Sequence, residues 1–392
     1  MPQAVIVDVV RTPSGRGKPG GALSAVHPVD LVAGALTALL ERSGLESRQV
    51  DDVLMGCVSQ IGDQSLNIAR QAVLAAGFDE TVPAVTIDRQ CGSSQQAAHF
   101  AAQGVIAGAY DIVIAAGVES MSRVPLGSSA HGGTVSQGVA RRYPDGLVNQ
   151  GVSAELIAQR WGFSREELDA FSAESHRRAA DAWTRGAFDS QVIPVLAGAA
   201  DAVAFDETVR AGTTVDSLAG LKSAFRTDAL AARFPDLDWL ITAGNSSPLT
   251  DAASAVLIMS EEKAAALGLT PRARFHSFAV VGDDPMMMLT GPIPATKRIL
   301  ERSGLAIDDL DAYEVNEAFA SVPLAWLREV GADPAKLNPW GGAIALGHAV
   351  GASGTRLLGT LVSYLEATGG RYGLQTMCEG GGMANATVIE RL

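Results

Sequence analysis

The chain has 392 residues and carries 30 Lys and Arg against 43 Asp and Glu, a formal net charge of −13 at pH 7. This charge disfavours long-range attraction to nucleic acid, and no apolar run is long enough to span a bilayer, so neither nucleic-acid binding nor membrane insertion is expected. The three cysteines are an odd number in a long chain, which argues against a disulfide scaffold and favours a reducing, cytoplasmic compartment.

The first half of the chain begins with strand-like residues 1–8, which lack the basic region of a secretory signal. Further on, the hexapeptide LERSGL at residues 40–45 recurs 260 positions later at residues 300–305. Each copy has the form of a helix ended by glycine, and each leads through an Asp-Asp pair into an apolar strand. The repeat therefore predicts an α/β fold of two pseudo-symmetric halves.

Cys91 follows a β-leaning stretch at residues 82–87 and opens a run of small residues, which places its thiol where a strand turns into a helix. Unpaired amides and the helix dipole at such a junction favour the thiolate, so we expect a thiol pKa below the usual value of about 8.5. A small, buried core cysteine is the alternative interpretation of the same pattern.

Residues 124–241 differ in sequence pattern from the flanking segments, with glycine- and serine-rich stretches, and are too long for a simple connecting loop. One amphipathic helix is predicted near residues 164–184, with Ser164 as its cap and Glu167 as the capping-box partner. We therefore expect an N-terminal half at residues 1–123, completed by 242–270, a loop domain inserted at 124–241, and a C-terminal half at 271–392. Residues 250–260 return to strand-like alternation.

Three further blocks in the second half carry chemistry. Asn316 begins the sequence NEAFA after an apolar run, His348 ends the glycine-rich sequence GGAIALGH, and Cys378 precedes a cluster of three glycines. Glycine lets the backbone approach a ligand closely and frees N–H groups for an oxyanion. Together with the Cys91 block, these segments supply a nucleophile, proton carriers and hydrogen-bond donors.

The four blocks resemble the thiolase family in order and approximate spacing, and the resemblance runs over nearly the whole chain. It implies the thiolase fold, a five-layer α-β-α-β-α arrangement with a loop domain over the coenzyme. It also implies an acyltransferase that assembles as a homodimer or homotetramer, acts on acyl-CoA with coenzyme A as co-substrate, and needs neither a metal nor a permanently bound cofactor.

The resemblance also implies the roles of individual residues. Cys91 would carry the acyl group, His348 would take up its proton, and Cys378 would exchange a proton with the α-carbon of acetyl-CoA. Asn316 would hold a water that forms one oxyanion hole with His348, and the amides of Cys91 and Gly380 would form the second.

For coenzyme A, the resemblance points to Ser247 on the pantetheine, to Ala318 and Phe319 along its tunnel, and to Lys222 near the adenine end. Residues 226–241 are longer than the usual family connection. The three methionines at 286–288 are expected either to line an acyl pocket or to lie in the core.

The resemblance predicts degradative thiolysis of 3-oxoacyl-CoA, as in fatty-acid β-oxidation or steroid degradation, because the Cys91 and Cys378 blocks are similar to those of an actinobacterial subgroup that includes sterol-catabolic thiolases. The chain departs from the common family pattern at Asp88, Ser94 and Ala349. The alternatives are a biosynthetic, acetoacetyl-CoA-forming thiolase, a ketoacyl synthase, and a non-catalytic acyl- or lipid-binding protein on the same scaffold. Asn316 and Cys378 argue against the synthase, which typically pairs two histidines.

Overall fold

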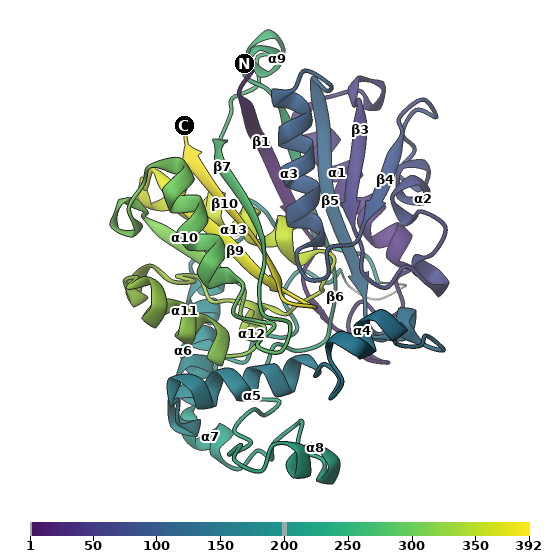
Figure 1. The fold of residues 1–392 in the computed structure, drawn as a ribbon. Helices are drawn as coiled ribbons and strands as arrows, with labels where there is room; N and C mark the ends of the chain where they lie inside the picture. The colour runs from purple at the N-terminus through teal and green to yellow at the C-terminus, as the bar shows by residue number, and fades with distance from the viewer. Residues whose placement is uncertain (1, 198–201) are drawn as a thin grey trace.

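The computed structural model describes residues 2–197 and 202–392, and Figure 1 shows their arrangement. The strands are β1 (Ala4–Arg11), β2 (Gly15–Arg16), β3 (Asp52–Gly56), β4 (Ala84–Ile87), β5 (Ile112–Ser120), β6 (Thr250–Ser260), β7 (Ala273–Gly282), β8 (Ala312–Val315), β9 (Tyr372–Glu379) and β10 (Met383–Arg391). The α-helices are α1 (Pro28–Ser43), α2 (Ile68–Ala75), α3 (Ser93–Ile106), α4 (Gln137–Arg142), α5 (Gln150–Trp161), α6 (Arg165–Thr184), α7 (Val215–Ala219), α8 (Asp228–Arg233), α9 (Glu261–Ala266), α10 (Pro292–Ser303), α11 (Ser321–Val330), α12 (Ala343–Leu346) and α13 (Ser353–Thr368).

The strands form two half-sheets that meet along one pair of strands. The order is β4-β3-β5-β6-β1 in the first half and β7-β10-β9-β8 in the second, with β2 pairing on β6. β3 runs parallel to β4 and β5, and β8 runs parallel to β9. The half-sheets are joined where Val5 pairs with Arg274 and Ile6 with Ala273, so backbone pairing makes the two expected sheet layers continuous at one end.

Helices cover the half-sheets in layers, as Figure 1 shows. α1 and α2 pack on the first half, and α10 packs on β7, β9 and β10 of the second half with α11 beside it. α3 and α13 pack against each other, and each of them contacts strands of both halves. The buried apolar residues follow the same layers, with separate clusters under α1, around α3 and α13, and under α10. The order of layers is therefore helix, sheet, helix, sheet, helix.

The internal repeat is visible in the backbone. α1 ends at Gly44 (φ 66°) and α10 ends at Gly304 (φ 72°), both in the left-handed conformation that glycine adopts without strain. The Asp51 carboxylate then accepts hydrogen bonds from two N–H groups at the start of β5 (2.6 and 2.9 Å). Asp311, 260 positions later, accepts the equivalent two bonds at β9 (2.6 and 3.0 Å). These matching bonds confirm that the hexapeptide marks two copies of one structural unit.

The segment between β5 and β6 carries α4 to α8 and lies at the lower edge of the molecule in Figure 1. The predicted capping box of α6 is present, since the Glu167 N–H donates to Ser164 Oγ (3.1 Å) and the Ser164 N–H donates to Glu167 Oε2 (2.7 Å). Among the helices in residues 2–197 and 202–392, none combines the length and apolar character needed to cross a membrane.

Candidate active site

The loop before α3 holds Cys91 in a fixed backbone conformation. Gln90 is left-handed (φ 49°), an uncommon conformation for a residue with a side chain. The hydroxyl of Ser93 donates to the Gln90 carbonyl (2.6 Å) and accepts from the N–H of Arg89 (2.9 Å), which stabilises the turn. Gly92 then precedes α3 as its N-cap residue. Cys91 therefore lies at a strand-to-helix junction, as the sequence predicts.

The surroundings of Cys91 oppose ionisation of its thiol. The side chain is buried, and burial together with the nearby carboxyl of Glu379 raises its pKa to about 12. Hydrogen bonds from the N–H groups of Cys91 and Gly380 lower the thiol pKa, but by less than burial and Glu379 raise it. The expectation of a lowered thiol pKa is thus wrong for this site, because desolvation outweighs the amides. Cys91 needs a base in order to react.

His348 is held in a tautomer that can serve as that base. Its ring Nδ1 lies 2.7 Å from Ser353 Oγ, and this hydroxyl gives its one proton to the Ala349 carbonyl (2.8 Å). Ser353 must therefore accept from Nδ1–H, which leaves the lone pair on Nε2. Burial, and secondly the positive charge of Arg356, lower the His348 pKa to about 3. The imidazole is neutral at physiological pH, with Nε2 free to take up a proton.

Asn316 and Cys378 complete the group. Asn316 follows β8, and its Nδ2 lies 3.4 Å from His348 Nε2, while its buried Oδ1 accepts no hydrogen bond from any residue that the structure describes. Cys378 lies in β9 opposite Ala384 and is fully buried. Burial, and then the charge of Cys91, raise the Cys378 pKa well above its usual value, which shows that the two thiols lie close together.

A buried carboxylate ties the loops of the site to the inserted segment. Glu317 accepts hydrogen bonds from Ser175 Oγ of α6 (2.7 Å), Asn338 Nδ2 (2.8 Å) and the Ile344 N–H (3.1 Å). The Ser175 hydroxyl also accepts from the N–H of Gly342 (3.1 Å). One serine of α6 thus contacts both the loop that carries Asn316 and the loop that leads to His348. Our sequence reasoning missed these bracing residues, as it missed Ser353.

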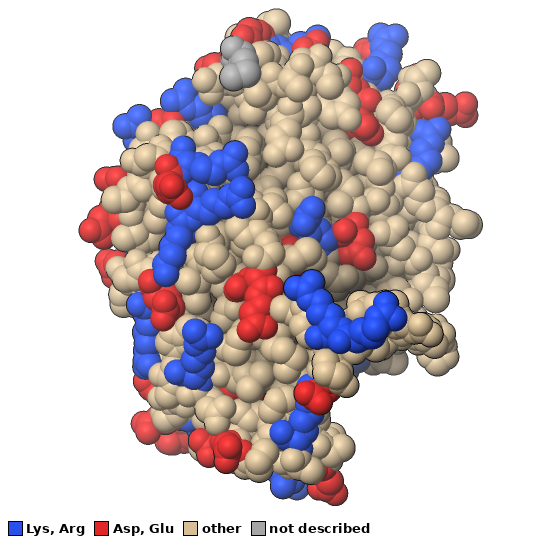
Figure 2. All heavy atoms as spheres, viewed as in Figure 1, with Lys and Arg blue, Asp and Glu red and all other residues tan. Residues whose placement is uncertain are grey.

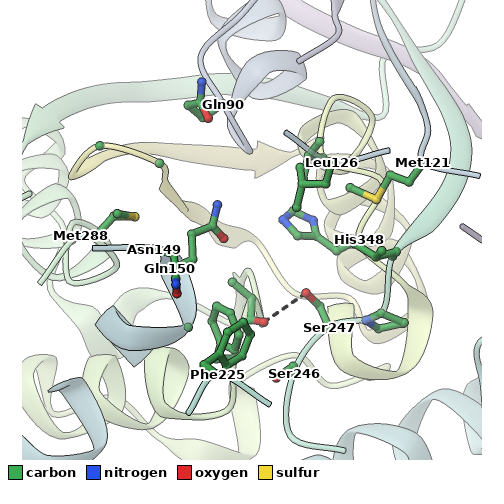
Figure 3. A pocket seen from close by; sticks show the side chains of 18 residues that line it. Gln90, Met121, Leu126, Asn149, Gln150, Phe225, Ser246, Ser247, Met288 and His348 are labelled. Atoms are coloured by element: carbon green, nitrogen blue, oxygen red, sulfur yellow. Dashed lines mark hydrogen bonds between the residues drawn. The ribbon is translucent and has the colours of Figure 1, made fainter. Parts of the chain in front are cut away.

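A cavity of about 710 Å³ opens above His348 and Gly380 (Figure 3). Ser247, Ala318 and Phe319 line it, and the Ser247 hydroxyl donates to the Ala318 carbonyl (3.1 Å), the dashed line in Figure 3. Its other walls include parts of the inserted segment, namely Leu126, Asn149, Gln150, Gly151 and Phe225. The cavity thus joins the predicted coenzyme-binding residues to the catalytic group.

The cavity tests two expectations from the sequence, one for the three methionines at 286–288 and one for Lys222. Of the three consecutive methionines, Met288 lines it, whereas Met286 and Met287 pack against apolar clusters, so each alternative holds for part of the run. Lys222 is exposed and does not belong to the lining, although Phe225, three residues further on, does. The structure therefore brings together eight of the nine predicted site residues and leaves Lys222 outside.

Comparison with known families identifies the class. Residues 4–262 match the model described as "Thiolase, N-terminal domain", and residues 269–391 match "Thiolase, C-terminal domain". The chain belongs to the thiolase family, and its catalysis is that of an acyltransferase.

Individual members of the family are similar to this chain over nearly their whole length. The chain is 47% identical over its whole length to a steroid 3-ketoacyl-CoA thiolase, FadA6, of Mycobacterium tuberculosis, 95% of which is covered. It is 44% identical to a 3-ketoacyl-CoA thiolase of Pectobacterium carotovorum, with both chains fully covered. The solved structure of an acetyl-CoA acetyltransferase from Bacillus anthracis superimposes with a TM-score of 0.89 at 38% identity, covering 100% of this chain and 99% of that one. These comparisons confirm the thiolase fold.

Proposed function

We propose that this thiolase cleaves 3-oxoacyl-CoA with coenzyme A, in the degradative direction, to acetyl-CoA and a shortened acyl-CoA. The observation that carries the proposal is one cavity lined by His348 and Gly380, with the Cys91 thiol accepting from the Gly380 N–H and lying close to Cys378. Relatives named 3-ketoacyl-CoA thiolase, one of them acting on steroids, support this substrate class.

In the first half of the reaction, Cys91 Sγ attacks the 3-oxo carbon while its proton passes to His348 Nε2. The resulting oxyanion is stabilised by the N–H groups of Cys91 and Gly380, which already point at the sulfur. The C2–C3 bond then breaks, leaving the acyl group on Cys91 and an enolate of acetyl-CoA. Cys378 donates its proton to C2 of this enolate. The enolate oxygen is held by His348 and by a water bound to Asn316.

In the second half, coenzyme A enters in place of acetyl-CoA. Its thiol gives a proton to the Cys378 thiolate and attacks the acyl carbon. The thioester bond to Cys91 breaks, and Cys91 recovers its proton from His348. Protons and charge balance over the cycle.

Ser247, Ala318 and Phe319 would contact the pantetheine arm, with Lys222 outside the cavity near the nucleotide. Coenzyme A is a polyanion, so its approach to a chain of net charge −13 requires local positive charge. Figure 2 shows Lys and Arg side chains gathered over α4, where Arg141 and Arg142 are exposed. In the sequence, α4 lies between Leu126 and Asn149 of the cavity wall, which supports a basic rim.

We further propose a homodimer or homotetramer. β4 is an edge strand of the sheet, and Val85 within it and Leu66 beside it are 41% and 87% exposed. An open edge with exposed apolar side chains is a surface that proteins usually cover.

All three cysteines are free, which supports a reducing compartment such as the cytoplasm. The return of the chain to the first half-sheet through β6 supports a loop domain at 124–241 between halves at 1–123 with 242–270 and at 271–392.

A thiolysis assay with 3-oxoacyl-CoAs of increasing length, from acetoacetyl-CoA to a ring-bearing substrate, tests the proposal. We expect turnover to rise with acyl size and to disappear in Cys91→Ser. Cys57→Ala is the matched control, because Cys57 lies in the core under α1 and should be dispensable for catalysis. Faster turnover of acetoacetyl-CoA than of longer substrates would indicate the biosynthetic alternative, and no turnover at all would indicate an acyl-binding protein.

A further inference from the structure

Glu379 carries a buried carboxyl group with no hydrogen-bond partner in the part of the chain that the structure describes. It is the last residue of β9, between Cys378 and Gly380, and is 0% exposed. Neither of its carboxyl oxygens accepts a hydrogen bond from residues 2–197 or 202–392. Buried polar atoms are normally paired, and an ionised carboxylate without a partner is costly. The position therefore calls for an explanation other than stability.

The carboxyl lies directly against the nucleophile loop. A Cβ atom placed on Gly92 would lie 2.0 Å from Glu379 Oε1 and 3.0 Å from Asn385 Oδ1, so the carboxyl occupies the space beside this glycine and would have to move to admit a side chain there. Cys91 immediately precedes this glycine, and the Glu379 carboxyl is the strongest charged influence on its thiol. The side chain of Glu379 thus touches the backbone that positions the sulfur.

The internal repeat supplies a comparison within the molecule. Glu119 is the last residue but one of β5, and Glu379 lies 260 positions later at the end of β9. The Glu119 carboxylate accepts four hydrogen bonds, from Val58 N–H (2.9 Å), Ser59 N–H (3.1 Å), Gln64 Nε2 (2.7 Å) and Gly351 N–H (3.0 Å). Gly351 itself lies 260 positions after Cys91. One glutamate thus braces the counterpart of the nucleophile loop, whereas the other faces the nucleophile loop and lacks these donors.

We propose that Glu379 is a positioning residue for Cys91: its carboxyl packs on Gly92 to fix the nucleophile loop, and its charge state sets the pH range in which the thiol ionises. The inference rests on the proposed role of Cys91. The charged and titratable groups that act on Glu379 are Arg89 and Asp88 from the loop before α3, and Glu379 in turn acts on Cys91 and Cys378.

The balance of these groups favours the protonated acid near neutrality. Burial raises the Glu379 pKa to about 8, Arg89 opposes the rise and Asp88 adds to it. Below that pH the carboxyl is neutral and does not oppose a thiolate. Above it, a negative charge develops beside Cys91 and raises the thiol pKa further. Above pH 8, Glu379 therefore reduces the increase in the ionised fraction of the Cys91 thiol that a higher pH would otherwise produce.

The test is the rate of Cys91 alkylation by iodoacetamide between pH 6 and 10, with the modified peptide identified by mass spectrometry. In the unmodified sequence, the rise in rate with pH should flatten above pH 8. In Glu379→Gln the flattening should disappear, and the rate at pH 9 should be about three- to tenfold higher, the effect of about half to one pKa unit in the thiol. Glu155→Gln, which removes another buried carboxyl of raised pKa, should leave the profile unchanged.

The outcomes distinguish the role of Cys91 from that of Glu379. Alkylation of another residue in the unmodified sequence would overturn the role of Cys91 itself. A Glu379→Gln profile that superimposes on the original, with Cys91 modified in both, would overturn the proposal for Glu379 alone. If the glutamine variant does not fold, Glu379→Asp takes its place in the test. This variant keeps a titrating carboxyl and should keep the flattening above pH 8. A Glu379→Asp profile without the flattening would also overturn the proposal.

Discussion

Ser353→Ala should slow catalysis without weakening substrate binding. The hydroxyl lies 2.7 Å from His348 Nδ1, and both side chains are buried. Removing it leaves Nδ1–H unpaired in the interior, at a cost of about 1–3 kcal/mol. The cost falls on the tautomer that presents a free Nε2, so kcat should decrease by about 5- to 150-fold. KM should change little, because Ser353 lies behind the imidazole and does not line the cavity.

Steady-state thiolysis at saturating coenzyme A measures this effect, with thermal unfolding measured in parallel. Ser363→Ala is the control, since it makes the same change in the same helix α13 at a residue that does not contact His348. A kcat within twofold of the original protein would refute the reasoning that Ser353 fixes the tautomer. A fall in kcat matched by the control would attribute the effect to the helix and would refute it too.

Two further predictions concern the cavity and the acid limit of stability. In Gly151→Ala the new Cβ would lie 2.1 Å from the Phe225 ring, so this ring, which lines the cavity, must move. KM for the acyl-CoA should therefore rise roughly fivefold, or about 1 kcal/mol. In Gly220→Ala the new Cβ meets nothing within 4 Å, and KM should stay unchanged. Burial, with a smaller effect of Arg89, lowers the His99 pKa to about 3, so its contribution to stability is complete above about pH 6.5 and is lost as the pH falls toward 3. Between pH 6.5 and 4.5, chemical denaturation should show His99→Gln losing about 2 kcal/mol less than the original protein, and equal losses would contradict the assignment.

The sequence predicted the elements whose signals are local. Glycine at the ends of α1 and α10, the cap at Ser164 and the strand-to-helix placement of Cys91 each depend on a few neighbouring residues. The four family blocks then located the site, because their order and spacing along the chain are specific. These are the features that short-range physical chemistry and a motif describe well.

What the sequence did not predict depends on contacts between distant segments. The raised pKa of Cys91 arises from burial and from Glu379, which is 288 positions away, and neither is visible in the residues around the thiol. Ser353 lies five residues after His348 and carries no motif that distinguishes it from other serines. The left-handed backbone of Gln90 follows from its hydrogen bonds with a turn, since glutamine has no intrinsic preference for it. Lys222 was inferred from the resemblance of residues 221–225 to a family loop, and the residues that follow, 226–241, are longer than the usual family connection.

The single hydroxyl of Ser175 has a consequence for how this enzyme could change its substrate. It belongs to α6, yet it contacts both Glu317 and Gly342, which hold the two catalytic loops in the second half of the chain. The segment that walls the binding cavity is therefore mechanically coupled to the chemistry beneath it. Specificity should diversify through side chains at the cavity wall, such as Leu126 or Met288, because exchanging the whole segment for that of a relative would also release the catalytic loops.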